Sequence, residues 1–348
     1  MARTNKDAEL WQSTLKLLQQ GERNLTYTLS QESGLSRQQI NNYLKRWIEE
    51  GRLERQGTSR KPRYILKEIQ ESYEIDLTLY RDESSIFSIT VKDSLKALPA
   101  NIYNILQFAF TEMVNNVIDH SGGTLLRIGL TITATRIQLY IADNGEGIFH
   151  RIQRLLGLSS PQQAILKLSP GKFTTDPTRH TGQGIFYTSR MCDLFFICSR
   201  SLIFTHHNSN SNDRLSETNI KQEQGTIVWM ELSRSSTLTS KEIFDRYADE
   251  KDYSFSKTEF SMRLALQEGE LISRSQARQI GAQLVGFRQA ILNFKNVDWI
   301  GQAFADELFR VFQNEHPSLR LIPLFTNESV SQMIERAILD STPKDPLA

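Results

Sequence analysis

The sequence predicts a multidomain α+β protein divided into residues 1–66, 67–236 and 237–348. Three observations lead to this prediction. The 348 residues exceed the length at which a single hydrophobic core keeps growing. Apolar residues recur with helical spacing in the first part, whereas the second and third parts alternate helical and strand patterns. The hydrophobic content of 39% and the charged content of 23% exclude a chain that is disordered throughout.

Nothing in the sequence is typical of a membrane or secreted protein. No apolar run approaches about 18 residues, and the first residues contain no apolar signal segment. Cys192 and Cys198 are the only cysteines, too few for a disulfide framework or a four-thiolate zinc site. We therefore expect a cytoplasmic protein with two reduced thiols and no membrane partner.

The N-terminal part reads as three helices followed by a hairpin. Apolar periodicity predicts helices at 7–20 and 26–32 and a third helix after them. The third helix begins at Ser36, which forms a capping-box pattern with Gln39. Two strands around a Gly-Thr-Ser-Arg-Lys-Pro tip are expected within 52–66.

Basic and amide side chains gather in the second half of this part. Residues 36–66 hold eight basic and three acidic side chains, a local charge of +5 in a chain of net charge +1. The pattern resembles the winged helix-turn-helix family, and this resemblance implies double-stranded DNA as a partner. The residues expected to contact DNA are Arg37, Gln38, Asn41, Asn42, Lys45, Arg60, Lys61 and Arg63. A winged helix that docks another protein or forms a homodimer is the alternative.

The second part contains a long helical pattern with a polar row. The alternating stretch 85–91 predicts a strand, and 102–119 predicts a helix. In that helix Glu112 and Asn116 are four residues apart and project from one face, and Asp119 extends the row. Such a row lies either on a solvent face or in the wall of a site.

Two glycine-rich turns follow this helix. Strands at 125–130 and 136–142 lead into Asp143-Asn-Gly-Glu-Gly-Ile148, where the backbone can approach a ligand and the carboxylate can accept hydrogen bonds. The second turn, His180-Thr-Gly-Gln-Gly-Ile185, opens a helical stretch, and amides at a helix N-terminus suit phosphates. A strand at 225–232 closes the region.

A polar run at 205–224 lies between the second turn and the closing strand. It has no apolar periodicity, so we expect an exposed loop or hairpin. His206 and His207 fall inside it, and without a partner at ligand spacing we expect both in solvent rather than on a metal.

The order of these motifs resembles the GHKL ATP-binding family, which includes gyrase, the mismatch-repair ATPases, histidine kinases and anti-sigma-factor kinases. The resemblance covers roughly residues 85–232, and three separated motifs agree with it in order. It implies a GHKL α/β sandwich that binds ATP and Mg²⁺, with a lid at 149–181.

The resemblance also implies roles for the matching residues. Asn116 is expected to coordinate Mg²⁺, Glu112 to orient and deprotonate the attacking water, and Asp143 to accept a hydrogen bond from the adenine amino group. The other residues expected at the nucleotide are Asp119, Gly145, Gly147, Ile148, Lys172, His180, Gly182, Gln183, Gly184 and Thr226.

The subgroup of the family decides which reaction is expected. Residues 67–100 contain no histidine, which disfavours an autophosphorylating histidine kinase. Asp119 is similar to the residue that gyrase and the mismatch-repair ATPases carry there, and together with Glu112 it favours slow ATP hydrolysis coupled to conformational change. An anti-sigma-type kinase that phosphorylates a serine or threonine of a partner protein, and a regulator that binds ATP without hydrolysis, stay open as alternatives.

The third part alternates helices and strands. A helix is expected to begin at Ser273, strands at 290–294 and 319–325, and further helices at 299–312 and 330–339. This alternation implies an α/β layer with at least partly parallel strands.

The order of these elements resembles the STAS fold of anti-sigma-factor antagonists, and more closely the STAS-like domains fused to GHKL modules. In the antagonists a serine is phosphorylated in the loop that corresponds to 296–303, which contains no serine or threonine here. We therefore expect a docking or regulatory role, with a regulatory protein as partner. Asp306, Glu307 and Arg310 are expected to form solvated ion pairs on an exposed helix face.

Overall fold

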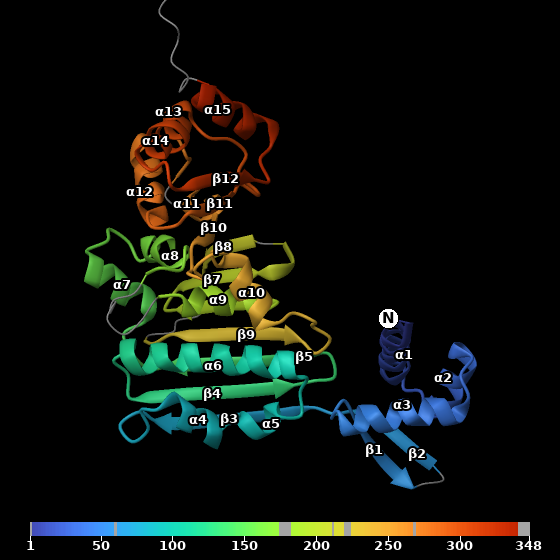
Figure 1. Ribbon diagram of the computed structural model, residues 1–348. Coiled ribbons are helices and arrows are strands. Elements are labelled where there is room, and N and C mark those ends of the chain that lie inside the picture. Colours follow the sequence, from blue (N-terminus) through green and yellow to red (C-terminus); the bar gives the residue numbers. More distant parts are fainter. Residues whose placement is uncertain are drawn as a thin grey trace, which may run out of the picture.

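The computed structural model describes residues 2–58, 61–173, 182–210, 212–218, 224–266 and 269–339. Within them the chain forms a two-stranded, a seven-stranded and a three-stranded sheet. The seven-stranded sheet and its helices make up the middle of the molecule, the blue N-terminal elements lie to one side, and the red C-terminal layer stacks on one end (Figure 1).

The N-terminal module has the predicted three helices and hairpin. Its elements are α1 (Ala2–Gln19), α2 (Leu25–Ser33), α3 (Arg37–Glu49), β1 (Leu53–Thr58) and β2 (Lys61–Leu66). The capping box at the start of α3 is confirmed: the Gln39 N–H donates to Ser36 Oγ at 3.2 Å, and the Ser36 N–H donates to Gln39 Oε1 at 2.9 Å. The fully buried Trp47 packs edge-to-face on Trp11 with ring centroids 4.9 Å apart, so this module has a core of its own.

The central sheet is antiparallel throughout the strands that the structure describes. Its strands, in spatial order, are β3 (Ile69–Asp76), β4 (Leu125–Ile132), β5 (Arg136–Asp143), β9 (Ile227–Ser233), β6 (Leu194–Ser199), β7 (Leu202–His207) and β8 (Asn212–Glu217). Strand β9 comes last in the sequence yet lies between β5 and β6. It therefore brings a late segment of the chain beside the Asp143 turn that follows β5.

Helices cover one face of this sheet. They are α4 (Glu83–Ile89), α5 (Lys92–Leu95), α6 (Ala100–His120), α7 (Ile148–Leu156), α8 (Gln163–Leu168), α9 (Gly184–Met191) and α10 (Ser240–Tyr247), and a 3₁₀ turn at Asn208–Asn210 follows β7. Helix α6 runs along the sheet (Figure 1) and buries Phe110 and Val114 completely. Because side chains alternate along β5, Leu139 is buried in the core, whereas Tyr140 points to the opposite face, where its ring stacks on Trp229.

Two local predictions for the central part are wrong. Residues 85–91 form no strand, because the Asp82 carboxylate accepts the Ser85 N–H at 2.7 Å and starts α4, whose Ile86 and Phe87 are buried. The run 205–224 holds the end of β7 and all of β8, which form a hairpin, one of the two structures expected there. His207 is exposed as predicted, but His206 is not in solvent. It is 4% exposed, and its Nδ1 lies 2.5 Å from Asp213 Oδ1 on the neighbouring strand.

The C-terminal layer has the predicted alternation and a parallel sheet in the order β10 (Lys257–Ser261), β11 (Gln289–Asn293), β12 (Arg320–Leu324). Its helices are α11 (Met262–Ala265), α12 (Arg274–Leu284), α13 (Gln302–Ala305), a π-helix (Asp306–Phe312), α14 (Gln313–Glu315) and α15 (Glu328–Leu339). The prediction of solvated ion pairs on an exposed helix face is wrong for Glu307, which is only 3% exposed. Its carboxylate accepts hydrogen bonds from Arg278 at 2.5 Å and from Arg274 at 3.3 Å. Burial on the π-helix is possible because both arginines of α12 satisfy its charge.

A buried arginine fastens the N-terminal module to the central sheet. Arg234, next to the end of β9, donates to the carbonyl oxygens of Glu50 at 2.6 Å, Gly51 at 3.2 Å and Thr133 at 3.1 Å. The first two are carbonyls at the C-terminal end of α3, which have no partner inside the helix. Burial lowers the pKa of Arg234 to about 10, so the guanidinium stays charged at neutral pH.

Hydrogen bonds between described residues fasten the C-terminal layer to the central one. Thr258 Oγ1 donates to the Pro170 carbonyl at 2.8 Å, and Arg190 of α9 donates to the Glu259 carbonyl at 3.4 Å. Lys172 donates to the Gly286 carbonyl at 2.6 Å. Strand β10 therefore touches both α9 and the segment that follows α8.

Replacing Arg234 by alanine should detach the N-terminal module. The three carbonyls lose their donor, and we expect the free energy of unfolding of this module to fall by about 2 kcal/mol or more. Thermal melting combined with limited trypsin digestion near residues 50–70 measures this. The control is Arg136→Ala, whose side chain is 57% exposed and pairs with Glu231; it should change melting little, and equal effects of the two variants would contradict the role of Arg234.

Candidate functional site

A cavity of about 350 Å³ lies between α6, the turn after β5, α7, residues 182–185 and the start of β9. We call it the central cavity. The residues predicted from the sequence that line it are Glu112, Asn116, Asp143, Gly147, Ile148, Gly182, Gln183, Gly184 and Thr226. They come from four segments spread over more than 100 residues of the chain, and the sheet order brings these segments together.

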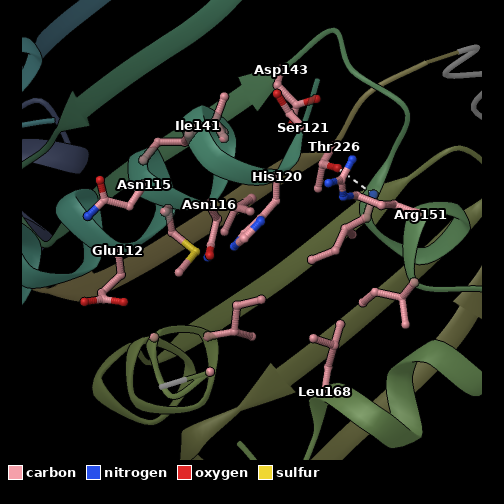
Figure 2. A pocket seen from close by; sticks show the side chains of 18 of the residues that line it. Glu112, Asn115, Asn116, His120, Ser121, Ile141, Asp143, Arg151, Leu168 and Thr226 are labelled. Atoms are coloured by element: carbon pink, nitrogen blue, oxygen red, sulfur yellow. Dashed lines mark hydrogen bonds between the residues drawn. The ribbon is translucent and has the colours of Figure 1, made fainter. Parts of the chain in front are cut away.

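Helix α6 contributes a polar row to the cavity. Glu112, Asn116 and His120 follow one another at intervals of four residues, and Figure 2 shows them projecting from one side of the helix. Gly184 lies against this row: a Cβ atom there would come within 2.1 Å of Glu112 Oε2. Glycine at this position thus leaves room for the Glu112 carboxylate, which would have to move away from any larger residue.

The turn after β5 holds a buried carboxylate. Asp143 is 9% exposed, and its Oδ1 accepts the Gly145 N–H at 2.7 Å. The start of β9 completes the turn, because the Asp143 N–H donates to the Thr226 carbonyl at 2.9 Å and Thr226 Oγ1 accepts the Ile148 N–H at 3.0 Å. Burial raises the pKa of Asp143, and the hydrogen bonds from Gly145 and Thr226 oppose this increase only in part.

Gly145 lies behind Asp143 rather than in the cavity wall. A Cβ atom there would meet the Ser121 carbonyl oxygen at 2.1 Å, so glycine lets the turn pack on the end of α6. Its contribution to the site is therefore the position of Asp143, to which its N–H donates.

Residues 182–184 place backbone amides at the edge of the cavity. Helix α9 begins at Gly184, directly after Gln183, and both residues line the cavity. The first N–H groups of a helix have no partner within it, and the helix dipole adds partial positive charge there. This edge is therefore suited to an anion.

Besides Gly145, two described residues that were predicted at the nucleotide, Asp119 and Lys172, are not in the cavity wall. Asp119 is exposed at the end of α6. Lys172 points to the C-terminal layer, where its ammonium donates to Gly286 and lies 4.2 Å from the centre of the Phe287 ring, so in this conformation it does not face the cavity. His180 lies outside the residues that the structure describes.

The polar residues of the cavity wall that the sequence analysis did not select are Asn115, His120, Ser121 and Arg151. Figure 2 shows Arg151 reaching from α7 towards Thr226. Its Nε is buried and has no hydrogen-bond partner among the described residues, which suits an anionic or polar ligand. The spacing of His120 from Asn116 was a signal available in the sequence, whereas that of Arg151 was not, because its place depends on how α7 packs.

The surface predicted to contact DNA is exposed. On α3 these residues are Arg37, Gln38, Asn41, Asn42 and Lys45, and on β2 they are Lys61 and Arg63; all are exposed. Arg60 lies outside the described residues. The polar side of α3 and the basic strand β2 are thus available to a partner.

Comparison with known proteins identifies one part of the chain. Residues 270–335 match the family described as the STAS-like domain of unknown function (DUF4325). The match extends from α12 into α15, so the STAS-like character expected for the third part is confirmed. No curated protein matches the chain in sequence.

Two kinds of feature are absent from the described residues. No helix among them has both the length and the apolar character needed to cross a bilayer. They contain no cluster of three or more His, Cys, Asp or Glu side chains suited to a metal ion.

Replacing Asp143 by asparagine should change how the free energy of unfolding depends on pH. The pKa of Asp143 is raised above its ordinary value of 3.8, so stability is lost as pH rises from 3.8 through the raised pKa and the buried group ionises. Asparagine can still accept the Gly145 N–H but does not ionise. We expect the free energy of unfolding of Asp143→Asn, relative to wild type, to increase between pH 4 and pH 7, by about 1.4 kcal/mol for each pH unit by which the pKa is raised.

Denaturant unfolding at several pH values measures this difference. The control is Asp93→Asn, because the hydrogen bond from Lys96 lowers the pKa of the exposed Asp93. A lowered pKa stabilises the fold above the ordinary pKa, so this variant should show the opposite sign. If the difference in free energy of unfolding between Asp143→Asn and wild type does not change with pH, the raised pKa of Asp143 is contradicted.

Proposed function

We propose that the chain is a cytoplasmic ATP-dependent regulator that binds Mg-ATP in the central cavity and hydrolyses it slowly. One observation carries this proposal: the polar face of α6, the Asp143 turn and residues 182–184, which are far apart in the sequence, line one cavity. These segments are the ones whose order resembles the GHKL ATP-binding family. The volume of about 350 Å³ is within the range of small-molecule sites.

Asp143 and Thr226 support adenine recognition at one end of the cavity. One oxygen of the buried carboxylate accepts the Gly145 N–H, and a carboxylate has further lone pairs for an exocyclic amine. Ile141 and Val228 of the flanking strands add apolar contact for a ring. An amine donor there would also compensate the cost of burying the charge of Asp143.

Glu112, Asn116 and the amides at the start of α9 support phosphate binding at the other end. The carboxamide oxygen of Asn116 is a ligand type that Mg²⁺ accepts, alongside phosphate oxygens and water. When bound, the ion supplies positive charge that offsets the negative charge of the phosphates. Glu112 lies one turn from Asn116 on the same face, which suits a carboxylate that orients a water molecule and takes its proton.

Two rigid elements support coupling between the cavity and the outer domains. Strand β9 begins beside Thr226 in the cavity and ends next to Arg234, which holds the end of α3. Helix α9 begins at Gly184 in the cavity and carries Arg190, which donates to β10. ATP can change DNA or partner binding through these elements only if it binds one domain arrangement more tightly than another.

A protein kinase that phosphorylates a partner is the second candidate. It is favoured by a groove that shares Glu112 and Gly184 with the central cavity and could admit a segment of another protein. The STAS-like layer is then a docking or regulatory domain, because its loop 296–303 carries no serine or threonine to accept a phosphoryl group.

Replacing Glu112 by glutamine should abolish turnover but retain nucleotide. We expect ATP hydrolysis to fall by a factor of about 10² to 10⁴, because general-base catalysis contributes that much. Calorimetry with a non-hydrolysable ATP analogue should give an affinity close to that of wild type, whereas Asn116→Ala should lose the magnesium-dependent part of binding. Release of labelled free phosphate supports the ATPase, and transfer to protein supports the kinase. Absence of analogue binding by the wild type would overturn the proposal.

Removing positive charge from β2 should weaken DNA binding without changing nucleotide affinity. For Lys61→Ala combined with Arg63→Ala we expect the slope of log K against log salt to fall by about 0.9 for each phosphate that the protein no longer neutralises. Fluorescence anisotropy with a random duplex at several salt concentrations measures it. Arg127→Ala, an exposed basic residue of the central sheet, is the control. A slope unchanged by the double substitution would favour a protein-docking role for this module.

A further inference from the structure

A second hollow adjoins the central cavity. It has a volume of about 290 Å³ and shares Glu112, Gln183 and Gly184 with the central cavity. We call it the aromatic groove, because the rest of its wall is mainly five rings: Phe108, Tyr187, Phe244, Tyr253 and Phe255. These rings come from α6, α9, α10 and the turn before β10.

The rings support one another at the base of the groove. Phe244 lies edge-to-face with Phe108 at 5.3 Å and with Tyr187 at 4.7 Å between centroids, and Tyr187 lies 5.2 Å from Phe255. Such a cluster offers both apolar surface and the negative faces of aromatic rings. It is thus suited to a group that is apolar along its length and positive at its end.

Tyr253 forms an exposed edge of the groove. Tyr253 is 79% exposed. Its backbone φ is 57°, which is uncommon for a bulky residue. The turn around it is closed by the Asp249 N–H, which donates to the Ser254 carbonyl at 2.8 Å, and by Arg288, which donates to Asp252 at 3.1 Å. The exposed ring is therefore held by an ordered turn.

The charged side chains in the wall of the groove are acidic, and the nearby Lys172 ammonium lies 5.8 Å from the centre of the Phe255 ring. The described residues that line it include the carboxylates of Glu112 and Asp245 and no lysine, arginine or histidine. Asp245 pairs with Lys241 one turn earlier, but the two side chains are 54% and 81% exposed. An exposed pair of this kind contributes little, so a cation held against the rings can displace Lys241.

We propose that the aromatic groove binds a basic side chain, a guanidinium or an ammonium group, that a partner polypeptide carries. The methylene stem packs on Phe244 and Tyr253, and the cationic head pairs with Asp245. This binding goes beyond the proposed nucleotide function and does not require ATP. Because the two hollows share Glu112 and Gly184, the bound side chain lies directly beside the central cavity.

Fluorescence anisotropy of a fluorescein-labelled hexa-arginine peptide, at low salt and without nucleotide, tests this inference on the full chain. We expect saturable binding that Tyr253→Ala weakens about two- to fivefold, the effect of an exposed cation–π contact. Asp245→Asn should weaken it by a similar factor, through loss of one charge pair. The analogue affinity of both variants should equal that of wild type, so this result is independent of the ATP proposal.

Matched controls distinguish the groove from general charge attraction. Asp93→Asn removes an exposed carboxylate that also pairs with a lysine of its own helical segment, and Tyr80→Ala removes a tyrosine that is 43% exposed. Both should bind the peptide as wild type does. The inference is overturned if a hexa-glutamine peptide binds as tightly, if Tyr253→Ala and Asp245→Asn bind hexa-arginine as wild type does, or if the controls lose as much affinity as they do.

Discussion

The buried carboxylate of Asp143 is the constraint on which the rest of the site depends. A charged group that is 9% exposed is tolerated only where donors surround it, and the Gly145 N–H is one of these donors. The same turn is closed by two hydrogen bonds to Thr226, at the start of β9. The hydrogen bonds at Asp143 therefore hold β9 next to β5 and fix one wall of the central cavity at the same time.

That arrangement also explains how the three parts of the chain are joined. Strand β9 leads from Thr226 to Arg234, and Arg234 holds the end of α3. Helix α9 leads from the cavity edge to Arg190, whose guanidinium lies 4.1 Å from the centre of the Phe186 ring and donates to β10. Both links are short regular elements rather than loops.

Local patterns in the sequence were reliable where neighbouring residues decide the structure. The capping box of Ser36 and Gln39, the long helix at 102–119 and the strands of the third part are present as predicted. Predictions failed where a helix cap outweighed an alternating pattern, or where a residue distant in the sequence supplied the partner of a buried charge or ring. The Asp82 cap starts helix α4 in a stretch that alternates like a strand. Asp213 pairs with the buried His206, and two arginines of α12 pair with the buried Glu307.

The sequence alone determined the polar row on α6 and the two glycine turns, because each depends on spacing within a few residues. Only the tertiary structure decided that these motifs meet in one cavity, that Lys172 faces the C-terminal layer and that Arg151 enters the cavity wall. The physical reason is that sheet order and helix packing bring together residues that are far apart in the chain, and no local pattern encodes that choice.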